Sequence, residues 1–175
     1  DGLMIASREG HIDLVRMLLG RSDANAQCLD ERGFGMTALM FAASEGREDV
    51  VRILTLKSDM ELKDKLGQTA LHLAATSGNR KCVRALGTLC KLNPQDNAGA
   101  TPIGLAATAG NTSCVEELAK LGANSSILDM RGRSPLDLAV AGSHLRTAAA
   151  LLPRTPIDLV RSSLALALSR GDSDL

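Results

Sequence analysis

One phrase recurs at a nearly constant interval, and no other property of the chain restricts its fold as strongly. The phrase begins at Gly35, Gly67, Gly99 and Gly132, so consecutive copies start 32, 32 and 33 residues apart. The four copies read GMTALMFAA, GQTALHLAA, GATPIGLAA and GRSPLDLAV. A fixed period of about thirty residues indicates a repeat protein, in which neighbouring units stack and bury a shared core.

The phrase also predicts where helices begin. Its third residue is always one whose hydroxyl caps a helix N-terminus by accepting a free backbone N–H: Thr37, Thr69, Thr101 and Ser134. Pro102 and Pro135 follow two of these residues directly, at the first helical position, where a missing N–H costs nothing. Each repeat is therefore predicted to open with a helix at this point.

A second helix is predicted in each unit. The first helix should end at a glycine suited to a left-handed turn: Gly10, Gly46, Gly78 and Gly110. An apolar set at helical spacing follows each of these: Leu14, Val15 and Leu18; Val50, Val51 and Leu54; Cys82, Val83 and Leu86; Cys114, Val115 and Leu118. Asp30, Asp64, Asp96 and Asp129 open the segments between units, which read as tight turns.

These residues resemble the ankyrin repeat, most completely from Asp64 to Gly78, over about residues 1–153. The resemblance implies an all-α repeat solenoid of stacked helix-turn-helix units with projecting β-turn or hairpin tips. We expect one domain over residues 1–168, with repeats at about 1–29, 30–63, 64–95, 96–128 and 129–153 and a closing helix at about 155–168. Residues 169–175 should form a disordered tail.

The later repeats depart from the family pattern at three positions. Gly104 and Asp137 stand where the family often has histidine, and Ser143 stands where the family glycine would fall. Gly104 within a helix should cost about 0.5 to 1 kcal/mol relative to alanine. At the C-terminal end, Leu164 to Leu168 also alternate as a strand would, but a single strand there would have no partner.

Charge and composition exclude several classes of function. Lysine plus arginine equals aspartate plus glutamate at 20 each, without a basic patch for nucleic acid. The chain has no apolar run of membrane-spanning length and no signal-peptide layout at its N-terminus, so we expect a cytoplasmic protein in a reducing compartment. Because the chain does not begin with Met and enters a repeat at once, we expect that it is cut from something longer.

The reactive side chains show no pattern of a catalytic or metal site. His11, His72 and His144 lie at repeat positions where the family's histidines bond backbone, and Cys28, Cys82, Cys90 and Cys114 lack metal-ligand spacing. We therefore expect no enzyme activity, no cofactor and no metal. The chain should be a monomer that binds a protein or peptide; the alternative is a passive spacer or regulatory segment of a larger, even enzymatic, protein.

The resemblance also assigns the binding surface, because the family's tip residues and the two residues before the helix-ending glycine face a groove. Partner contacts are predicted at Glu31, Arg32, Phe34, Met36, Glu45, Lys65, Leu66, Gln68, Thr76, Ser77, Asn97, Met130, Arg131 and Arg133. Further groove positions are Arg8, Glu9, Ser44, Ala98, Ala100, Thr108 and Ala109.

Within this surface, we expect Phe34 and Leu66 to form the apolar centre. Lys65, Arg131 and Arg133 should steer an acidic ligand. Phe34 lies on a tip that is longer than the others, because Asp30 precedes Gly35 by five positions where the other repeats use three. Alternatively, the Phe34 ring folds back onto the first repeat and fills the gap left by the insertion.

Overall fold

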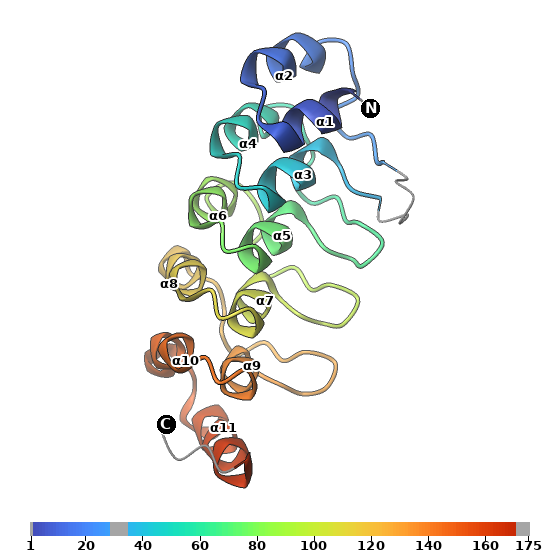
Figure 1. The fold of residues 1–175 in the computed structure, drawn as a ribbon. Helices are drawn as coiled ribbons and strands as arrows, with labels where there is room; N and C mark the ends of the chain where they lie inside the picture. The colour runs from blue at the N-terminus through green and yellow to red at the C-terminus, as the bar shows by residue number, and fades with distance from the viewer. Residues whose placement is uncertain (1, 29–34, 171–175) are drawn as a thin grey trace.

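The chain forms a row of antiparallel helix pairs (Figure 1). The computed structural model describes residues 2–28 and 35–170. The pairs are α1 (Gly2–Glu9) and α2 (Ile12–Leu19), α3 (Ala38–Ser44) and α4 (Glu48–Leu54), α5 (Ala70–Thr76) and α6 (Arg80–Gly87), α7 (Pro102–Thr108) and α8 (Thr112–Leu121), and α9 (Pro135–Ala141) and α10 (Leu145–Leu151). A short 3-10 turn, η1 (Leu152–Arg154), leads to α11 (Ile157–Arg170).

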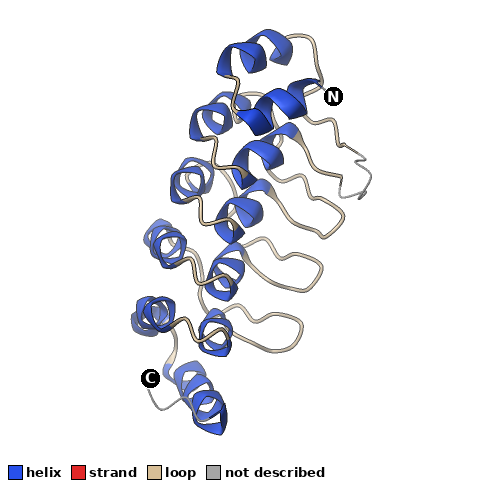
Figure 2. Cartoon of the chain, in the orientation of Figure 1, coloured by secondary structure: helices blue, strands red, loops and turns tan. Residues whose placement is uncertain are grey.

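The helices lie in two layers. The first helices of successive pairs, α1, α3, α5, α7 and α9, pack side by side in one layer, and the second helices form the other (Figure 1). The loops that join one pair to the next project from the first-helix layer (Figure 2). Extended pairing in the described part of the chain is limited to one isolated bridge between Cys28 and Met36. This architecture is the all-α repeat solenoid that the sequence predicts.

The predicted caps begin the first helices. The Thr37 hydroxyl accepts the N–H of Met40 at 3.3 Å, and Ser134 accepts the N–H of Asp137 at 3.1 Å. In the third repeat His72 takes part instead, because its Nδ1 accepts the N–H of Thr69 at 3.1 Å. Each such bond satisfies a backbone group that the helix end leaves unpaired, so the sequence marks these helix starts correctly.

The turn within each pair fixes how the repeats stack. Gly10, Gly46, Gly78 and Gly110 adopt the predicted left-handed conformation, with φ between 70° and 84°. The side chain that follows the turn reaches back to the preceding repeat, as Asn79 does when its Nδ2 donates to Ala43 O at 2.9 Å and Ser44 O at 2.8 Å. Equivalent bonds to the preceding first helix come from Arg47, Asn111 and His144. We call these bonds the register contacts.

Glycine is needed at these turns for space as well as for conformation. A Cβ atom on Gly46 would lie 2.7 Å from Asn79 Oδ1, and one on Gly110 would lie 2.7 Å from the His144 ring. A side chain would therefore displace the residue that makes the register contact. In the last pair Ser143 takes the left-handed position with φ 56°, although it is not glycine.

The core is a continuous layer of buried, mostly aliphatic side chains between the two layers of helices. Leu39, Leu71, Ile103 and Leu136, which hold the same position in successive repeats, are all buried. The predicted second-helix residues of α4, α6 and α8 are also buried. Leu14 is a correction, because it is 41% exposed: among the described residues, no preceding helix pair covers that side of α2.

The last helix packs on the first-helix layer, against α9. Asp137, at the family's histidine position, accepts from the Ser134 hydroxyl at 2.7 Å and from the Ser163 hydroxyl of α11 at 2.6 Å. The segment is thus a helix and not a strand, but it runs to Arg170, two residues into the expected tail. The rest of that tail, residues 171–175, lies outside the described residues.

The second-helix layer carries an ion pair in which the carboxylate is buried and the arginines are partly exposed. Glu117 of α8 accepts from Arg84 Nε at 2.6 Å and from Arg80 Nε at 2.8 Å, both on α6. The bond from Arg84, with help from Arg80, outweighs burial and holds the pKa of Glu117 at about 2, against an ordinary value of 4.5. The carboxylate therefore links two repeats in its ionised form.

Replacing Gly104 with alanine should stabilise the fold. A Cβ there would meet Thr101 Oγ1 at 3.4 Å and Leu138 at 3.6 Å, which are ordinary contacts, and the glycine has no left-handed backbone. Gly104→Ala should raise the free energy of unfolding by about 0.5 to 1 kcal/mol in urea denaturation, since helical glycine costs backbone entropy. The matched Gly46→Ala, in a left-handed turn, should lower it by at least about 1 kcal/mol. Equal effects of the two changes would contradict this account.

Glu117→Gln should remove a pH-dependent contribution to stability. Because the folded pKa is depressed, this contribution is complete above about pH 4.5 and is lost as the pH falls toward 2. At pH 7 the change should cost about 1 to 3 kcal/mol, as for charge-assisted hydrogen bonds, and the difference from the parent chain should shrink between pH 4.5 and 3. Urea titrations at several pH values measure this, with Glu116→Gln on the exposed side of α8 as the control. A difference that stays constant with pH would show that the ion pair is not its source.

Candidate functional site

The turns between repeats are built around inward-facing aspartates. Asp96 Oδ1 accepts the N–H of Ala98 at 2.9 Å and of Ala100 at 2.8 Å. Asp64 and Asp129 bond their own turns in the same way. Since both N–H groups come from the turn itself, each aspartate fixes the shape of its tip and directs its charge away from solvent.

The tips are also bonded to one another. Asn97 N donates to Leu66 O at 2.9 Å, and Met130 N donates to Ala98 O at 3.0 Å. The Asn97 side chain adds a bond from Nδ2 to Lys65 O at 2.9 Å. Residues 64–68, 96–100 and 129–133 therefore form one connected edge of the molecule, which we call the tip row.

The tip row presents apolar side chains beside free cations. Leu66 is 48% exposed and Met130 is 77% exposed. Lys65 and Arg131 are exposed near them and make no ion pair within residues 2–28 and 35–170. The aspartates of the row face inward, so the charge that reaches solvent here is predominantly positive.

The ends of the first helices carry the other predicted groove positions, which we call the floor. The exposed positions there are Arg8, Glu9, Glu45, Thr76, Ser77, Thr108 and Ala109. The charges lie in the first two repeats, where Arg8 pairs with Glu9 at 3.1 Å. From the third repeat on, the floor is small and uncharged, and the hydroxyl of Thr76 bonds its own helix at His72 O.

The arrangement of tips and helix pairs is that of a known family. The family model described as ankyrin repeats (3 copies) matches the chain over two overlapping ranges, residues 3–96 and 87–162. This chain is an ankyrin-repeat protein. Ankyrin repeats are in general protein–protein interaction modules. A comparison with curated proteins finds no match.

A histidine of the ankyrin pattern ties the third repeat to the next tip. Because His72 Nδ1 accepts the N–H of Thr69, the ring proton lies on Nε2, which donates to Ala100 O at 3.1 Å. Burial lowers the pKa of His72, so the ring stays neutral. His144 also bonds backbone, whereas His11, at the same repeat position, makes no such bond in the described part of the chain. The structural role predicted for the histidines is therefore confirmed for two of them.

The sequence does not reveal a row of side-chain hydrogen bonds that joins successive repeats next to the tips. Gln27 Nε2 donates to Lys63 O, Lys63 Nζ to Gln95 O, and Gln95 Nε2 to Leu128 O, at 2.8 to 3.2 Å. Lys63 and Gln95 each stand directly before a tip aspartate, and Gln27 lies 36 residues before Lys63. A long polar side chain at one repeat position was the signal that could have revealed this row of bonds.

Several predicted contact residues have another role in the ankyrin structure. Arg133 pairs with Asp129 at 2.7 Å, so its charge is partly neutralised. It is therefore less suited than Lys65 and Arg131 to steer an acidic ligand. Burial opposes ionisation of Asp129, but bonds from the N–H and guanidinium of Arg133 outweigh it and lower the Asp129 pKa. Ala100 is buried, which corrects its assignment to the groove.

The remaining predictions divide between described and undescribed residues. Met36 is half-buried and packs against the core, and Gln68 is half-buried with its amide 3.4 Å from Asp96 Oδ2. Asn97 is exposed in the tip row. Glu31, Arg32 and Phe34 lie outside the described residues, and so does the question of which way the Phe34 ring points.

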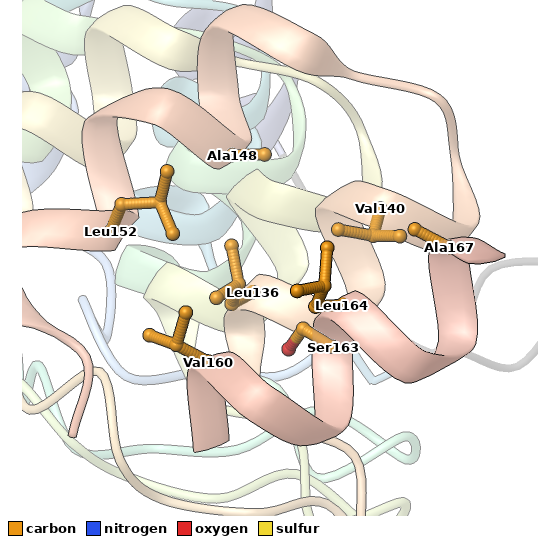
Figure 3. A pocket seen from close by; sticks show the side chains of 8 residues that line it. All are labelled: Leu136, Val140, Ala148, Leu152, Val160, Ser163, Leu164 and Ala167. Carbon is orange, nitrogen blue, oxygen red and sulfur yellow. The ribbon is translucent and has the colours of Figure 1, made fainter. Parts of the chain in front are cut away.

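An apolar hollow of about 110 Å³ lies apart from the tips, among α9, α10 and α11 (Figure 3). Leu136, Val160 and Leu164 line it, and its one hydroxyl, on Ser163, is bonded to Asp137. Across the described ranges, no cluster of three or more His, Cys, Asp or Glu could hold a metal ion. Nor does any described helix have the length and apolarity to span a membrane.

Removing a tip aspartate should loosen the tip row. Asp96→Ala deletes two hydrogen bonds to buried or half-buried backbone N–H groups, and we expect a loss of about 1 to 3 kcal/mol in the free energy of unfolding. Asp49→Ala, an exposed site on α4, should change it by less than about 0.5 kcal/mol. Denaturation curves of both variants provide the measurement, and an unchanged curve for Asp96→Ala would argue against the tip geometry.

Proposed function

We propose that this chain binds a partner protein or peptide along the tip row and the floor beside it. The observation that carries the proposal is the exposure of Leu66 and Met130 on an edge held by backbone hydrogen bonds. Binding to a preformed edge requires little ordering of the protein, so the apolar contact is retained as affinity.

The charges of the tip row favour a partner with acidic residues beside its apolar ones. Lys65 and Arg131 have no acidic partner among the described side chains, and the tip aspartates are occupied by backbone N–H groups. Complementary charge speeds association and sets orientation more than it adds affinity. The small, uncharged floor at Thr76, Ser77, Thr108 and Ala109 leaves room for the partner's side chains.

The alternative of a passive spacer is supported less well. A spacer needs only charged, interchangeable side chains at its tips, whereas Leu66 and Met130 expose apolar surface to solvent. The proposal involves no catalytic step. It places the protein, as a monomer, in a reducing cytoplasmic setting, which suits its four free cysteines. Burial raises the pKa of the Cys82 thiol to about 11.

Acidic substitutions in the tip row should abolish partner capture. Leu66→Asp and Met130→Asp each remove an anchor worth about 1.5 to 3 kcal/mol, which corresponds to a Kd weakened roughly 10- to 100-fold. The measurement is affinity capture with the immobilised chain, followed by titration of the partner that is identified. Phe34→Asp in the same assay tests the remaining predicted anchor.

The matched control is Leu56→Asp, because Leu56 is 82% exposed and follows α4 in the second-helix layer (Figure 1). This variant and Arg52→Glu should bind normally, and all variants should keep their helical circular dichroism. Arg84→Glu is unsuitable as a control, since Arg84 bonds the buried Glu117. Loss of capture in Leu56→Asp but not in the tip variants would refute the assignment of the surface.

A further inference from the structure

The middle of the tip row carries an apolar strip. Met130 N donates to Ala98 O on the middle tip, and Asn97 N of that tip donates to Leu66 O. Ala98 therefore lies between the tips that carry Leu66 and Met130. A Cβ on Gly99 would lie 3.1 Å from Met130 Cγ, so the methionine side chain lies against the middle tip. The strip is defined as Leu66, Ala98 and Met130, which are all exposed to solvent.

A free cation stands at each end of the strip. Lys65 precedes Leu66 and Arg131 follows Met130 in the sequence. Both cations are exposed, and neither forms an ion pair with a described side chain. The carboxylate of Asp96, on the middle tip, is buried and accepts from its own tip. A partner that covers the strip therefore meets a positive charge at either end and an uncharged centre.

Two of the three tips offer no backbone donor to an added strand. In residues 96–100 and 129–133 every N–H is bonded, either within its own tip or to the preceding tip. The N–H groups of residues 64–68 other than that of Lys65 are bonded in the same way. A peptide that joins a sheet edge as a strand needs free donors as well as acceptors along that edge. Recognition at the strip therefore depends on side chains.

A helix suits such a surface better than an extended segment does. The backbone groups of a helix bond one another, whereas an extended segment would lie on the strip with its own N–H groups and carbonyls unpaired. The steps from Leu66 to Met130 span at most about 15 Å, since hydrogen-bonded Cα atoms lie up to about 5.5 Å apart. A helix presents apolar side chains on one face about every 5.4 Å, so about three turns match the strip.

We propose that the partner lays an acidic amphipathic helix along the strip. One apolar side chain of the helix rests on the methyl group of Ala98, between Leu66 and Met130, and carboxylates beside it face Lys65 and Arg131. This proposal rests on the proposed function, because it names the kind of partner that the tip row takes. It differs from a general affinity for apolar groups, since it requires both the helical form and the carboxylates.

The test measures the binding of synthetic peptides to the 175-residue chain by fluorescence anisotropy. The helical probe is a labelled peptide of about 20 residues, which is long enough to form a helix. It has leucines three and four residues apart, glutamates on both sides of the leucines, and alanine and glutamine elsewhere. A second peptide carries proline at its centre, and a third carries glutamine in place of each glutamate.

The helical peptide should bind at least about tenfold more tightly than the proline peptide, because proline breaks the helix. It should also bind more tightly than the glutamine peptide at low salt. That difference should shrink in about 1 M NaCl, which screens exposed charges.

Substitutions in the strip locate the contact. Leu66→Asp and Met130→Asp should each weaken binding of the helical peptide roughly 10- to 100-fold. Ala98→Leu should also weaken it roughly tenfold, because the added side chain fills the space that the helix needs. If the strip only attracted apolar groups, Ala98→Leu would strengthen binding instead. The matched control is Ala149→Leu, at an exposed position of α10, which should leave the Kd unchanged.

Three results would overturn the proposal: no binding of the helical peptide, equal binding of the proline peptide, or an Ala98→Leu chain that binds as well as the parent or better. Equal binding of the proline peptide would assign the strip to an extended segment. The proposed function is judged separately, by partner capture. If Leu66→Asp and Met130→Asp leave capture intact, the proposed function fails; if they abolish capture while the peptides give one of the three results, only the helix is wrong.

Discussion

The structure depends on the register contacts that follow each left-handed turn. A glycine such as Gly46 reverses the chain between two helices and leaves no Cβ, and Asn79 of the next repeat fills that space while it bonds the carbonyls of Ala43 and Ser44. Neither carbonyl accepts from the N–H four residues further on, so the contact satisfies a helix end and joins two repeats at once. Each repeat is thereby held at a fixed offset from its neighbour.

This fixed offset also shapes the candidate binding surface. Equivalent tips fall side by side, which allows Asn97 N to reach Leu66 O and Met130 N to reach Ala98 O. The tips therefore act as one edge instead of as separate loops, although strand pairing in the described residues is limited to one isolated bridge. Leu66 and Met130 lie on this edge with exposed side chains, so the proposed partner would meet a surface that is already formed.

The sequence predicts the repeated parts of the fold well, because the same local signals recur. The caps at Thr37 and Ser134, the left-handed glycines and the buried Leu71 each follow from one residue type at one position. Features that depend on a neighbouring repeat could not be read locally. The exposure of Leu14 reflects what covers α2, and the pairing of Arg133 with Asp129 reflects side-chain geometry.

The C-terminal helix, α11, also has features that depend on a neighbouring repeat and could not be read locally. Thr155-Pro156-Ile157 resembles the start of a repeat, yet Ile157 is 65% exposed where Leu136 is buried, because α11 packs on α9 without a tip of its own. The helix was predictable from its spacing, but the bond between Ser163 and Asp137 that anchors it was not. In the candidate site, the exposure of tip residues such as Leu66 and Met130 could be predicted, but the ion pair that Arg133 forms could not.

Amide hydrogen exchange tests the central claim, that the register of the stack joins the tips into one rigid edge, most directly. The N–H groups of Asn97 and Met130 donate across tips, so they should be protected to nearly the extent of the core helix amides and exchange only when repeats separate. Exchange of these two amides at the rate of an unstructured chain, with the helices still protected, would show that the tips are independent loops and would contradict the account.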